Sequence, residues 1–184
     1  MTTLGRALLY IGVAALAIFA GFLLQNTKTS STPKHIAQNK HVTNDGASLI
    51  LATTLPDLQG TNQSVSQWKG KVLVVNFWAT WCEPCRREMP EFIKLQDELR
   101  DRGLLFIGIA LDQKSKVQQY SKEIRVNYPI LLGGIKAMEL AEAAGNRYSV
   151  LPFTVILNRN GEIVSTHVGR IARDKLEPIL KPLL

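Results

Sequence analysis

The feature that most constrains the fold of this chain is an apolar run that leads directly into two closely spaced cysteines. Residues 72–77 read Val-Leu-Val-Val-Asn-Phe and show no alternation of apolar and polar side chains. Such a run is typical of a strand that is buried on both faces of a sheet. Cys82 and Cys85 follow in a Cys-Glu-Pro-Cys unit, and residues 86–102 then carry apolar side chains at helical spacing. The pattern predicts a strand that leads into a helix whose first turn carries both sulfur atoms.

Two cysteines at such a helix start indicate redox chemistry. The N-terminus of a helix has unpaired N–H groups and the positive end of the helix dipole, so it stabilises a thiolate at Cys82. The thiolate is the form of cysteine that attacks disulfides. The thiol of Cys85 is close enough in the chain to resolve the mixed disulfide that forms. We therefore expect a thiol–disulfide oxidoreductase.

A lone Cys-x-x-Cys unit has two other interpretations, a structural disulfide and half of a zinc site. The disulfide would close a very short loop and would therefore remove little chain entropy. A structural zinc site needs four ligands, and the three histidines, His35, His41 and His167, show no ligand spacing. The number and spacing of the cysteines favour redox chemistry over both alternatives.

The N-terminal region predicts a membrane anchor. Residues 7–24 form an uninterrupted run of eighteen uncharged, mostly apolar residues, which meets the minimum length for a spanning helix. We expect residues 1–24 to be a transmembrane anchor or signal-anchor, residues 25–47 a flexible polar linker, and residues 48–184 one folded domain. Basic residues flank the apolar run on both sides, but the short N-terminal tail favours a domain outside the cytoplasm.

The net charge of the chain is +7, yet its Lys and Arg residues are interspersed with acidic residues and form no dense basic run. This distribution predicts a solvated cationic surface. We expect no nucleic-acid partner.

The rest of the pattern predicts an α/β domain with a central mixed sheet and helices on both faces. Short N-terminal edge strands are expected at 49–51 and 55–58. Apolar runs typical of buried strands lie at 72–77, 104–111 and 153–157. Asn160–Gly161 predicts a hairpin turn that leads to a partner strand at 163–168. Helices are expected at 86–102, 114–126, 137–144 and 173–180.

Residues 76–90, Asn-Phe-Trp-Ala-Thr-Trp-Cys-Glu-Pro-Cys-Arg-Arg-Glu-Met-Pro, resemble the thioredoxin superfamily. More narrowly, they resemble the membrane-anchored TlpA/ResA-like thiol–disulfide oxidoreductases of bacteria. The resemblance covers residues 48–184 and implies a thioredoxin-like fold with an added strand and helix within residues 112–147. It also implies a protein-disulfide reductase that needs no cofactor beyond its own redox-active disulfide.

The resemblance assigns a role to each matching position. Cys82 is expected to be the exposed nucleophile and Cys85 the buried resolving thiol. Pro152 is expected to follow a cis peptide bond, so that the N–H and C=O groups of Leu151 can pair with a substrate strand near the dithiol. Further contacts with substrate are expected from Trp81, Glu83 and Pro84. Trp78 is expected either to flank the site or to belong to the core.

Two departures from the thioredoxin pattern, at Asn76 and Phe153, modify these expectations, and Glu83 bears on the redox direction. Asn76 stands where thioredoxins have an aspartate that moves protons to and from the resolving cysteine. Glu88 lies one helical turn after Cys85 and is our candidate for that role, the alternative being a solvated charge on the helix. Phe153 stands where threonine commonly follows the cis-proline. Glu83 places negative charge beside the Cys82 sulfur and disfavours its thiolate, whereas Arg86 and Arg87 act in the opposite direction. We give more weight to Glu83, which predicts a reductant and not a strong oxidant.

The resemblance further implies a location and partners. The domain is expected in the periplasm, held at the bacterial inner membrane by a single-pass helix and active as a monomer. A membrane thiol carrier is expected to donate electrons, and protein disulfides, such as those of apocytochrome c, are expected to be the substrates. One rival function is a redoxin-type thiol peroxidase, whose Pro-x-x-x-Thr-x-x-Cys setting is absent from the sequence. Another is a copper-binding or chaperone module, although copper carriers of this fold usually space their cysteines by three residues.

Overall fold

The computed structural model describes residues 45–184, so the predicted anchor and most of the predicted linker lie outside the described residues. Within residues 45–184, no helix combines the length and the apolar character that a bilayer-spanning segment requires.

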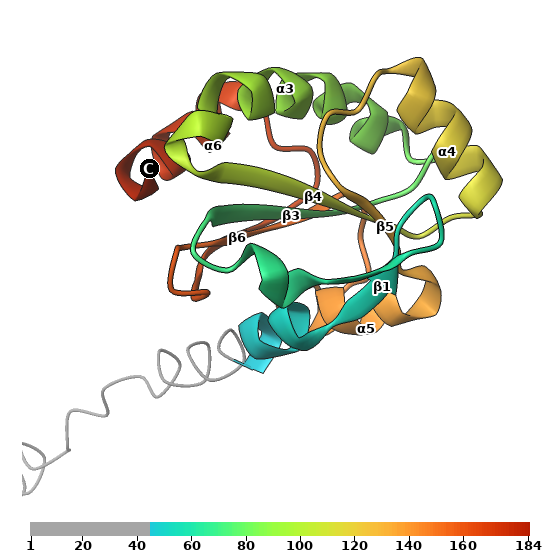
Figure 1. Cartoon of the computed structure of the whole chain (residues 1–184), viewed down its shortest axis with the longest axis horizontal. Coiled ribbons are helices and arrows are strands. Elements are labelled where there is room, and N and C mark those ends of the chain that lie inside the picture. The colour runs from blue at the N-terminus through green and yellow to red at the C-terminus, as the bar shows by residue number, and fades with distance from the viewer. Residues whose placement is uncertain (1–44) are drawn as a thin grey trace, which may run out of the picture. The chain divides into compact units, whose positions relative to one another are not determined.

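A five-stranded mixed sheet forms the centre of the domain, with strand order β5-β4-β3-β6-β7 (Figure 1). β3 pairs in parallel with β4, and β4 pairs in parallel with β5. β6 pairs antiparallel with β3 on one side and with β7 on the other. The strands span Val72–Trp78 (β3), Leu104–Ala110 (β4), Ile130–Leu132 (β5), Phe153–Leu157 (β6) and Ile163–Val168 (β7). The sheet confirms the predicted α/β class.

Helices cover both faces of this sheet, α3 and α6 on one face and α5 on the other (Figure 1). The helices span Glu83–Leu99 (α3), Lys114–Glu123 (α4), Gly134–Ala143 (α5) and Arg173–Leu180 (α6). The described part of the chain also has short 3-10 helices at Val65–Trp68 (η1), Arg100–Arg102 (η2) and Lys181–Leu183 (η3). The left-handed conformation of Gly103 (φ 91°) ends the α3–η2 segment.

The central strand β3 is buried on both faces because its side chains alternate between two apolar cores. Val72, Val74 and Trp78 pack in the core that contains the apolar side chains of α3, α4 and α6. Leu73, Val75 and Phe77, which point to the other face, pack in the core that contains the apolar side chains of α5. Asn76 therefore belongs to the row of β3 that faces α3.

The segment from β5 to α5 is the strand and helix that the family resemblance predicted between residues 112 and 147. β5 extends the sheet beyond β4, with Gly108 opposite Ile130 in the parallel register. α5 then buries Ala137, Leu140 and Ala141 against the sheet face opposite α3.

The N-terminal part of the domain differs from the prediction in three ways. Residues 45–52 lie in a helix, so the strand predicted at 49–51 is wrong and the fold extends into the predicted linker. In this helix Ala47 and Ile50 are buried while Leu49 is exposed, so the buried residues are three positions apart, as in a helix. The predicted strand contains only three apolar residues, which are too few to show this spacing. β1 (Thr54–Pro56) pairs with β2 (Asn62–Ser64) in a separate two-stranded antiparallel sheet, and an isolated antiparallel bridge between Asp57 and Leu131 joins this segment to β5, at the edge of the main sheet.

The predicted turn at Asn160–Gly161 is confirmed between β6 and β7. The N–H of Gly161 donates to Asn158 C=O at 2.9 Å, and the side-chain oxygen of Asn158 accepts from Asn160 N–H and Glu162 N–H, both at 3.0 Å. Gly161 has a φ of 83°, a conformation that favours glycine.

Candidate active site

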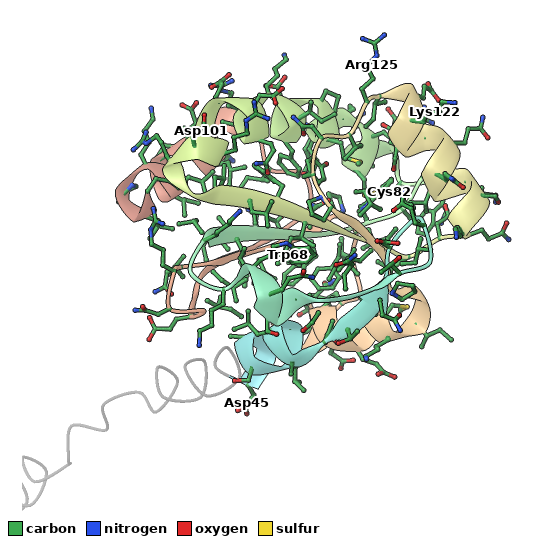
Figure 2. All side chains as sticks on the ribbon, in the orientation of Figure 1. Asp45, Trp68, Cys82, Asp101, Lys122 and Arg125 are labelled. Carbon is green, nitrogen blue, oxygen red and sulfur yellow. A yellow bond between two sulfur atoms is a disulfide. The ribbon has the colours of Figure 1, made fainter. Side chains whose placement is uncertain are left out.

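The two cysteines sit at the start of α3, at the carboxyl end of β3. Cys82 is the N-cap of α3, and its sulfur accepts a hydrogen bond from Cys85 N–H at 3.3 Å. Pro84 lies in the first turn, where its missing N–H breaks no helical hydrogen bond. Cys82 and Cys85 form a disulfide with a Cα–Cα distance of 5.3 Å. Figure 2 shows Cys82 on the side of the domain where α4 lies, and Asp101 on the opposite side.

The burial of the two sulfurs corrects one expectation. Cys85 is fully buried, as predicted, but Cys82 is only 5% exposed in the disulfide form and is not an exposed residue. Both cysteines belong to the core on the α3 face, where Leu151 packs as a half-buried neighbour. Access to the Cys82 sulfur is therefore restricted by the residues around it.

The loop before β6 has the predicted cis peptide bond, between Leu151 and Pro152. Pro152 C=O accepts a hydrogen bond from Gly169 N–H at 2.8 Å. Within residues 45–184, no hydrogen bond joins the N–H or C=O group of Leu151 to another residue. These two backbone groups are therefore available to an extended peptide.

The buried side chain of Asn146 holds this loop in place. Its Nδ2 group donates to Val150 C=O at 2.9 Å, and its Oδ1 atom accepts from Val150 N–H at 3.1 Å. Within the closed turn, Ser149 adopts a positive φ of 50°. Because Val150 immediately precedes Leu151, the two hydrogen bonds fix the backbone that leads into the cis bond.

A second set of contacts fixes the segment before the dithiol. Thr80 donates its N–H (3.2 Å) and its hydroxyl group to Oδ2 of Asp112, the second residue after β4. Burial opposes the charge on Asp112, but the hydrogen bonds from Thr80 and from Gln113 N–H outweigh it and hold the pKa of Asp112 below its ordinary value. The carboxylate thus links the carboxyl ends of β3 and β4.

Glu88 lies on α3, the dithiol helix, and its side chain is fully buried, so the alternative of a solvated helix charge is wrong. Its Oε1 atom accepts from Asn76 Nδ2 at 2.8 Å, and its Oε2 atom accepts from Ile171 N–H at 2.9 Å. Asn76 Nδ2 also donates to the hydroxyl group of Thr154 at 3.1 Å. Asn76 and Thr154 are directly opposite each other in the β3–β6 pairing, which places their side chains on the same face.

Burial raises the pKa of Glu88 to about 7, although the hydrogen bonds from Ile171 N–H and Asn76 and the charge of Arg170 act in the opposite direction. A carboxyl group with such a pKa exchanges its proton near neutral pH. It is therefore suited to proton transfer in a way that an ordinary surface glutamate is not.

The remaining predicted site residues occupy different environments. Trp81 is 69% exposed beside Cys82, whereas Trp78 is fully buried and packs against Tyr120 with the ring centroids 5.8 Å apart. Trp78 is therefore a core residue. Glu83 is exposed and lies 3.8 Å from the guanidinium group of Arg87.

Sequence reasoning missed Asp112, Asn146 and Thr154. For Asp112 a signal was present, because it follows a buried strand parallel to β3, and polar residues at the carboxyl ends of adjacent parallel strands meet at one edge. For Asn146 and Thr154 the sequence contains no comparable signal. Among the described residues, no three His, Cys, Asp or Glu side chains gather as metal ligands, and His167 Nε2 lies 3.2 Å from Arg170 C=O.

Comparison with known proteins gives a consistent result. A family described as Redoxin matches residues 44–180. The chain is 33% identical over 128 residues to the thiol-disulfide oxidoreductase ResA of Halalkalibacterium halodurans, an alignment that covers 69% of this chain and 70% of the relative. It is 35% identical over 131 residues to the thioredoxin-like protein YneN of Bacillus subtilis, covering 67% of this chain and 72% of the relative.

Solved structures show the same fold. A thioredoxin-family thiol:disulfide interchange protein from Chlorobium tepidum aligns with a TM-score of 0.65 and 27% identity, over 71% of this chain and 92% of that chain. A candidate thioredoxin from Neisseria meningitidis aligns with a TM-score of 0.63 and 30% identity, over 73% of this chain and 89% of that chain.

Proposed function

The chain belongs to the Redoxin family and is a thiol–disulfide oxidoreductase, and from that premise we propose that it reduces protein disulfides outside the cytoplasm. The observation that carries the proposal is the position of the dithiol. Cys82 caps α3, where its thiolate is stabilised, and Cys85 is buried one turn further along the same helix.

The reaction proceeds in two exchanges. The Cys82 thiolate attacks one sulfur of a substrate disulfide, so that a mixed disulfide forms and one substrate thiolate leaves. Cys85 then attacks the Cys82 sulfur, which forms the Cys82–Cys85 disulfide and releases the second substrate thiolate. The substrate gains two electrons and the protein loses two. An external dithiol donor, in our proposal a membrane thiol carrier, returns the protein to its reduced form.

Glu88 accepts the proton that Cys85 must lose before it attacks. Its pKa of about 7 allows it to take up and release a proton near neutral pH. Asn76 supports both states of Glu88, because its amide donates to the carboxylate as observed and, after a half-turn, its oxygen accepts from the protonated carboxyl group. The Oδ1 atom of Asn76 has no partner among the described residues in the present arrangement.

The charge near the dithiol favours a reductant. Glu83 is the residue directly after Cys82, and its carboxylate disfavours a thiolate there. Arg87 lies 3.8 Å from Glu83 and acts in the opposite direction, but it is five residues from Cys82 whereas Glu83 is adjacent to it, so we expect the carboxylate to have the larger effect. A less favoured thiolate makes the dithiol form less stable relative to the disulfide.

The apolar run at residues 7–24 supports a location at the inner membrane with the domain in the periplasm. There, the reductant keeps cysteine pairs of other proteins reduced, and apocytochrome c is the substrate we favour, because the family resemblance of residues 76–90 implies it. Protease treatment of spheroplasts tests the location, since a periplasmic domain is digested while the cell membrane stays intact.

The midpoint potential of the Cys82–Cys85 couple tests the direction of the reaction. Equilibration of the purified protein with dithiothreitol or glutathione buffers measures it. We expect a value well below about −200 mV, the range of reductants. A value near −120 mV, typical of a strong oxidant, would contradict the argument from Glu83.

A further inference from the structure

We propose that a pocket at the edge of the central sheet, apart from the dithiol, binds an alkylammonium or alkylguanidinium group. Lysine and arginine side chains carry such a group, and so do free polyamines. The inference concerns a second site and goes beyond the proposed function, so either can fail without the other.

The pocket lies where the N-terminal hairpin meets the edge strand β5, and it has a volume of about 420 Å³. One wall comes from residues 57–68, and the other comes from the second half of α4 and from residues 126–131. The bridge between Asp57 and Leu131 joins the two walls, and Figure 1 shows the loop after β1 beside β5. None of the described lining residues belongs to α3 or to the loop before the cis bond.

The buried part of the lining is mostly apolar. Tyr128, Ile130 and Leu131 are buried, and Val126 and Pro129 are half-buried. The stem of a lysine or arginine side chain, with its three or four methylene groups, packs well on apolar surface of this kind while its charged end reaches a polar rim. The volume is sufficient for such a stem.

The polar rim presents hydrogen-bond acceptors. Asp57 Oδ2 accepts from Gln63 Nε2 at 2.9 Å, and Gln63 Oε1 accepts from Gln67 Nε2 at 2.9 Å. A carboxylate can only accept, so it fixes the direction of both hydrogen bonds. The side-chain oxygen of Gln67 therefore stands at the end of this chain as an open acceptor.

The negative charge of Asp57 is not neutralised within the described part of the chain. Its Oδ1 atom accepts from Gln59 N–H and Thr61 N–H, both at 2.9 Å, and no Lys or Arg forms an ion pair with it. The hydrogen bonds, chiefly that from Gln63, hold the pKa of Asp57 below its ordinary value. The carboxylate is therefore ionised at neutral pH.

Neighbouring cations leave this charge open to a ligand. The described lining contains no Lys or Arg. Lys114 Nζ lies 3.8 Å from the position that a Cβ atom of Gly60 would take, so it is near the turn, but it neither lines the pocket nor pairs with Asp57. Arg125, which precedes Val126 of the wall, points away from the domain (Figure 2).

The pocket also contains a buried hydroxyl group without a partner. Ser121 is 6% exposed, and its Oγ atom forms no hydrogen bond with any described residue. An unpaired buried polar group is uncommon in native proteins unless water or a ligand reaches it. A ligand rich in N–H donors offers a partner to this atom as well as to Asp57 and Gln67.

These groups together select a cation with several donors. An anion is repelled by Asp57 and finds no basic side chain in the described lining. An apolar ligand would leave the acceptors unpaired. An ammonium or guanidinium group has only donors and forms a charge-assisted hydrogen bond with a carboxylate.

The test measures ligand binding to the full-length, oxidised chain in micelles of an uncharged detergent. The ligands are a capped Gly-Lys-Gly peptide, its norleucine counterpart, which keeps the alkyl chain but lacks the ammonium group, and its glutamate counterpart. Cadaverine represents a free amine, and glucose represents a neutral polyol. The side-chain amide resonances of Gln59, Gln63 and Gln67 in ¹H–¹⁵N NMR spectra report binding in the pocket itself.

We expect the lysine peptide to bind about tenfold or more tightly than the norleucine peptide, and the glutamate peptide not to bind. Asp57→Asn keeps an oxygen for the two backbone N–H groups and should abolish the preference for lysine. Asp101→Asn is the matched control, because it changes the net charge equally but lies outside the pocket, and it should keep the preference. Gln59→Glu adds a carboxylate at an exposed position of the rim and should tighten binding of the lysine peptide several-fold.

Equal affinities for the lysine and norleucine peptides would overturn the inference, and so would equal effects of Asp57→Asn and Asp101→Asn. Glucose that binds more tightly than either amine would also overturn it, because the site would then select neutral polyols. Tighter binding of the lysine peptide than of cadaverine would support a protein side chain as the ligand, and the reverse would support a free amine. The midpoint potential, which tests the proposed function, is independent of all these results.

Discussion

Replacement of Glu88 by glutamine should change how the stability of the protein depends on pH. Glu88 is fully buried, and burial raises its pKa from an ordinary value of 4.5 to about 7. Below pH 4.5 the carboxyl group is protonated in both the folded and the unfolded chain. Between pH 4.5 and 7 the folded chain keeps a proton that the unfolded chain releases, so the free energy of unfolding falls as the pH rises. Above pH 7 both forms are ionised and the loss is constant.

The magnitude follows from the size of the shift. A pKa difference of about two and a half units corresponds to about 3 kcal/mol of stability lost between pH 4.5 and pH 8. Glutamine does not titrate, so this loss is absent in Glu88→Gln. The amide replaces one acceptor oxygen by a donor, so Asn76 can keep its contact with residue 88 only after a half-turn, which takes its Nδ2 group away from Thr154. That loss costs about 1–3 kcal/mol at every pH.

The assay is urea denaturation of the oxidised protein and of the variant at intervals from pH 4.5 to 8. The informative quantity is the difference between the two free energies of unfolding as a function of pH, because the constant cost of the lost hydrogen bond does not affect its slope. Glu139→Gln, at an exposed position on α5, serves as the control and should follow the wild-type curve. Parallel curves for wild type and Glu88→Gln would refute the claim that Glu88 changes its protonation in this range.

Three further predictions concern single positions. Cys85→Ala should leave a mixed disulfide between the protein and its substrate unresolved, which non-reducing electrophoresis and mass spectrometry detect; rapid release of both substrate thiols would contradict the assigned order of attack. Asn146→Ala removes two hydrogen bonds and should lower the free energy of unfolding by about 1–3 kcal/mol. It should also slow the reduction of peptide disulfides. An unchanged rate would show that the reaction does not require the loop to be held by Asn146. Gly108→Ala would place a methyl group 2.6 Å from Ile130 Cδ1 and 2.9 Å from Trp78 Nε1 and should cost about 1–3 kcal/mol in a thermal or urea melt; an unchanged melt would mean that these neighbours move aside freely.

Features encoded by neighbouring residues could be predicted from the sequence. The apolar run at 72–77, the Cys-Glu-Pro-Cys unit and the helix that follows specify a strand, a thiolate site and their connection without reference to the rest of the chain. The Asn160–Gly161 turn is local for the same reason. The helix at 45–52 could not be recognised, because the predicted strand within it contains only three apolar residues, and such a run has no measurable period.

The position of Pro152 could be predicted only through the family resemblance, since a proline before an apolar strand is also found in ordinary loops. The clamp on its loop, in which Asn146 bonds to Val150, was not predicted although the two residues are four apart. Asparagine after a helix most often indicates a turn, and nothing in the sequence indicates that the side chain of Asn146 is buried.

The sequence by itself determined the reaction type, because two thiols at a helix N-terminus are sufficient for thiol–disulfide exchange. The tertiary structure decided how that chemistry is controlled. Glu88 and Ile171 are 83 positions apart, yet their contact and the packing around Glu88 decide where its proton is released. A pocket next to Cys82 likewise forms only because Trp81, Met138 and Leu151, from three segments of the chain, lie together in its wall. Desolvation and cavity shape depend on which residues pack together after folding, and a linear pattern contains that information only where the contacts are local.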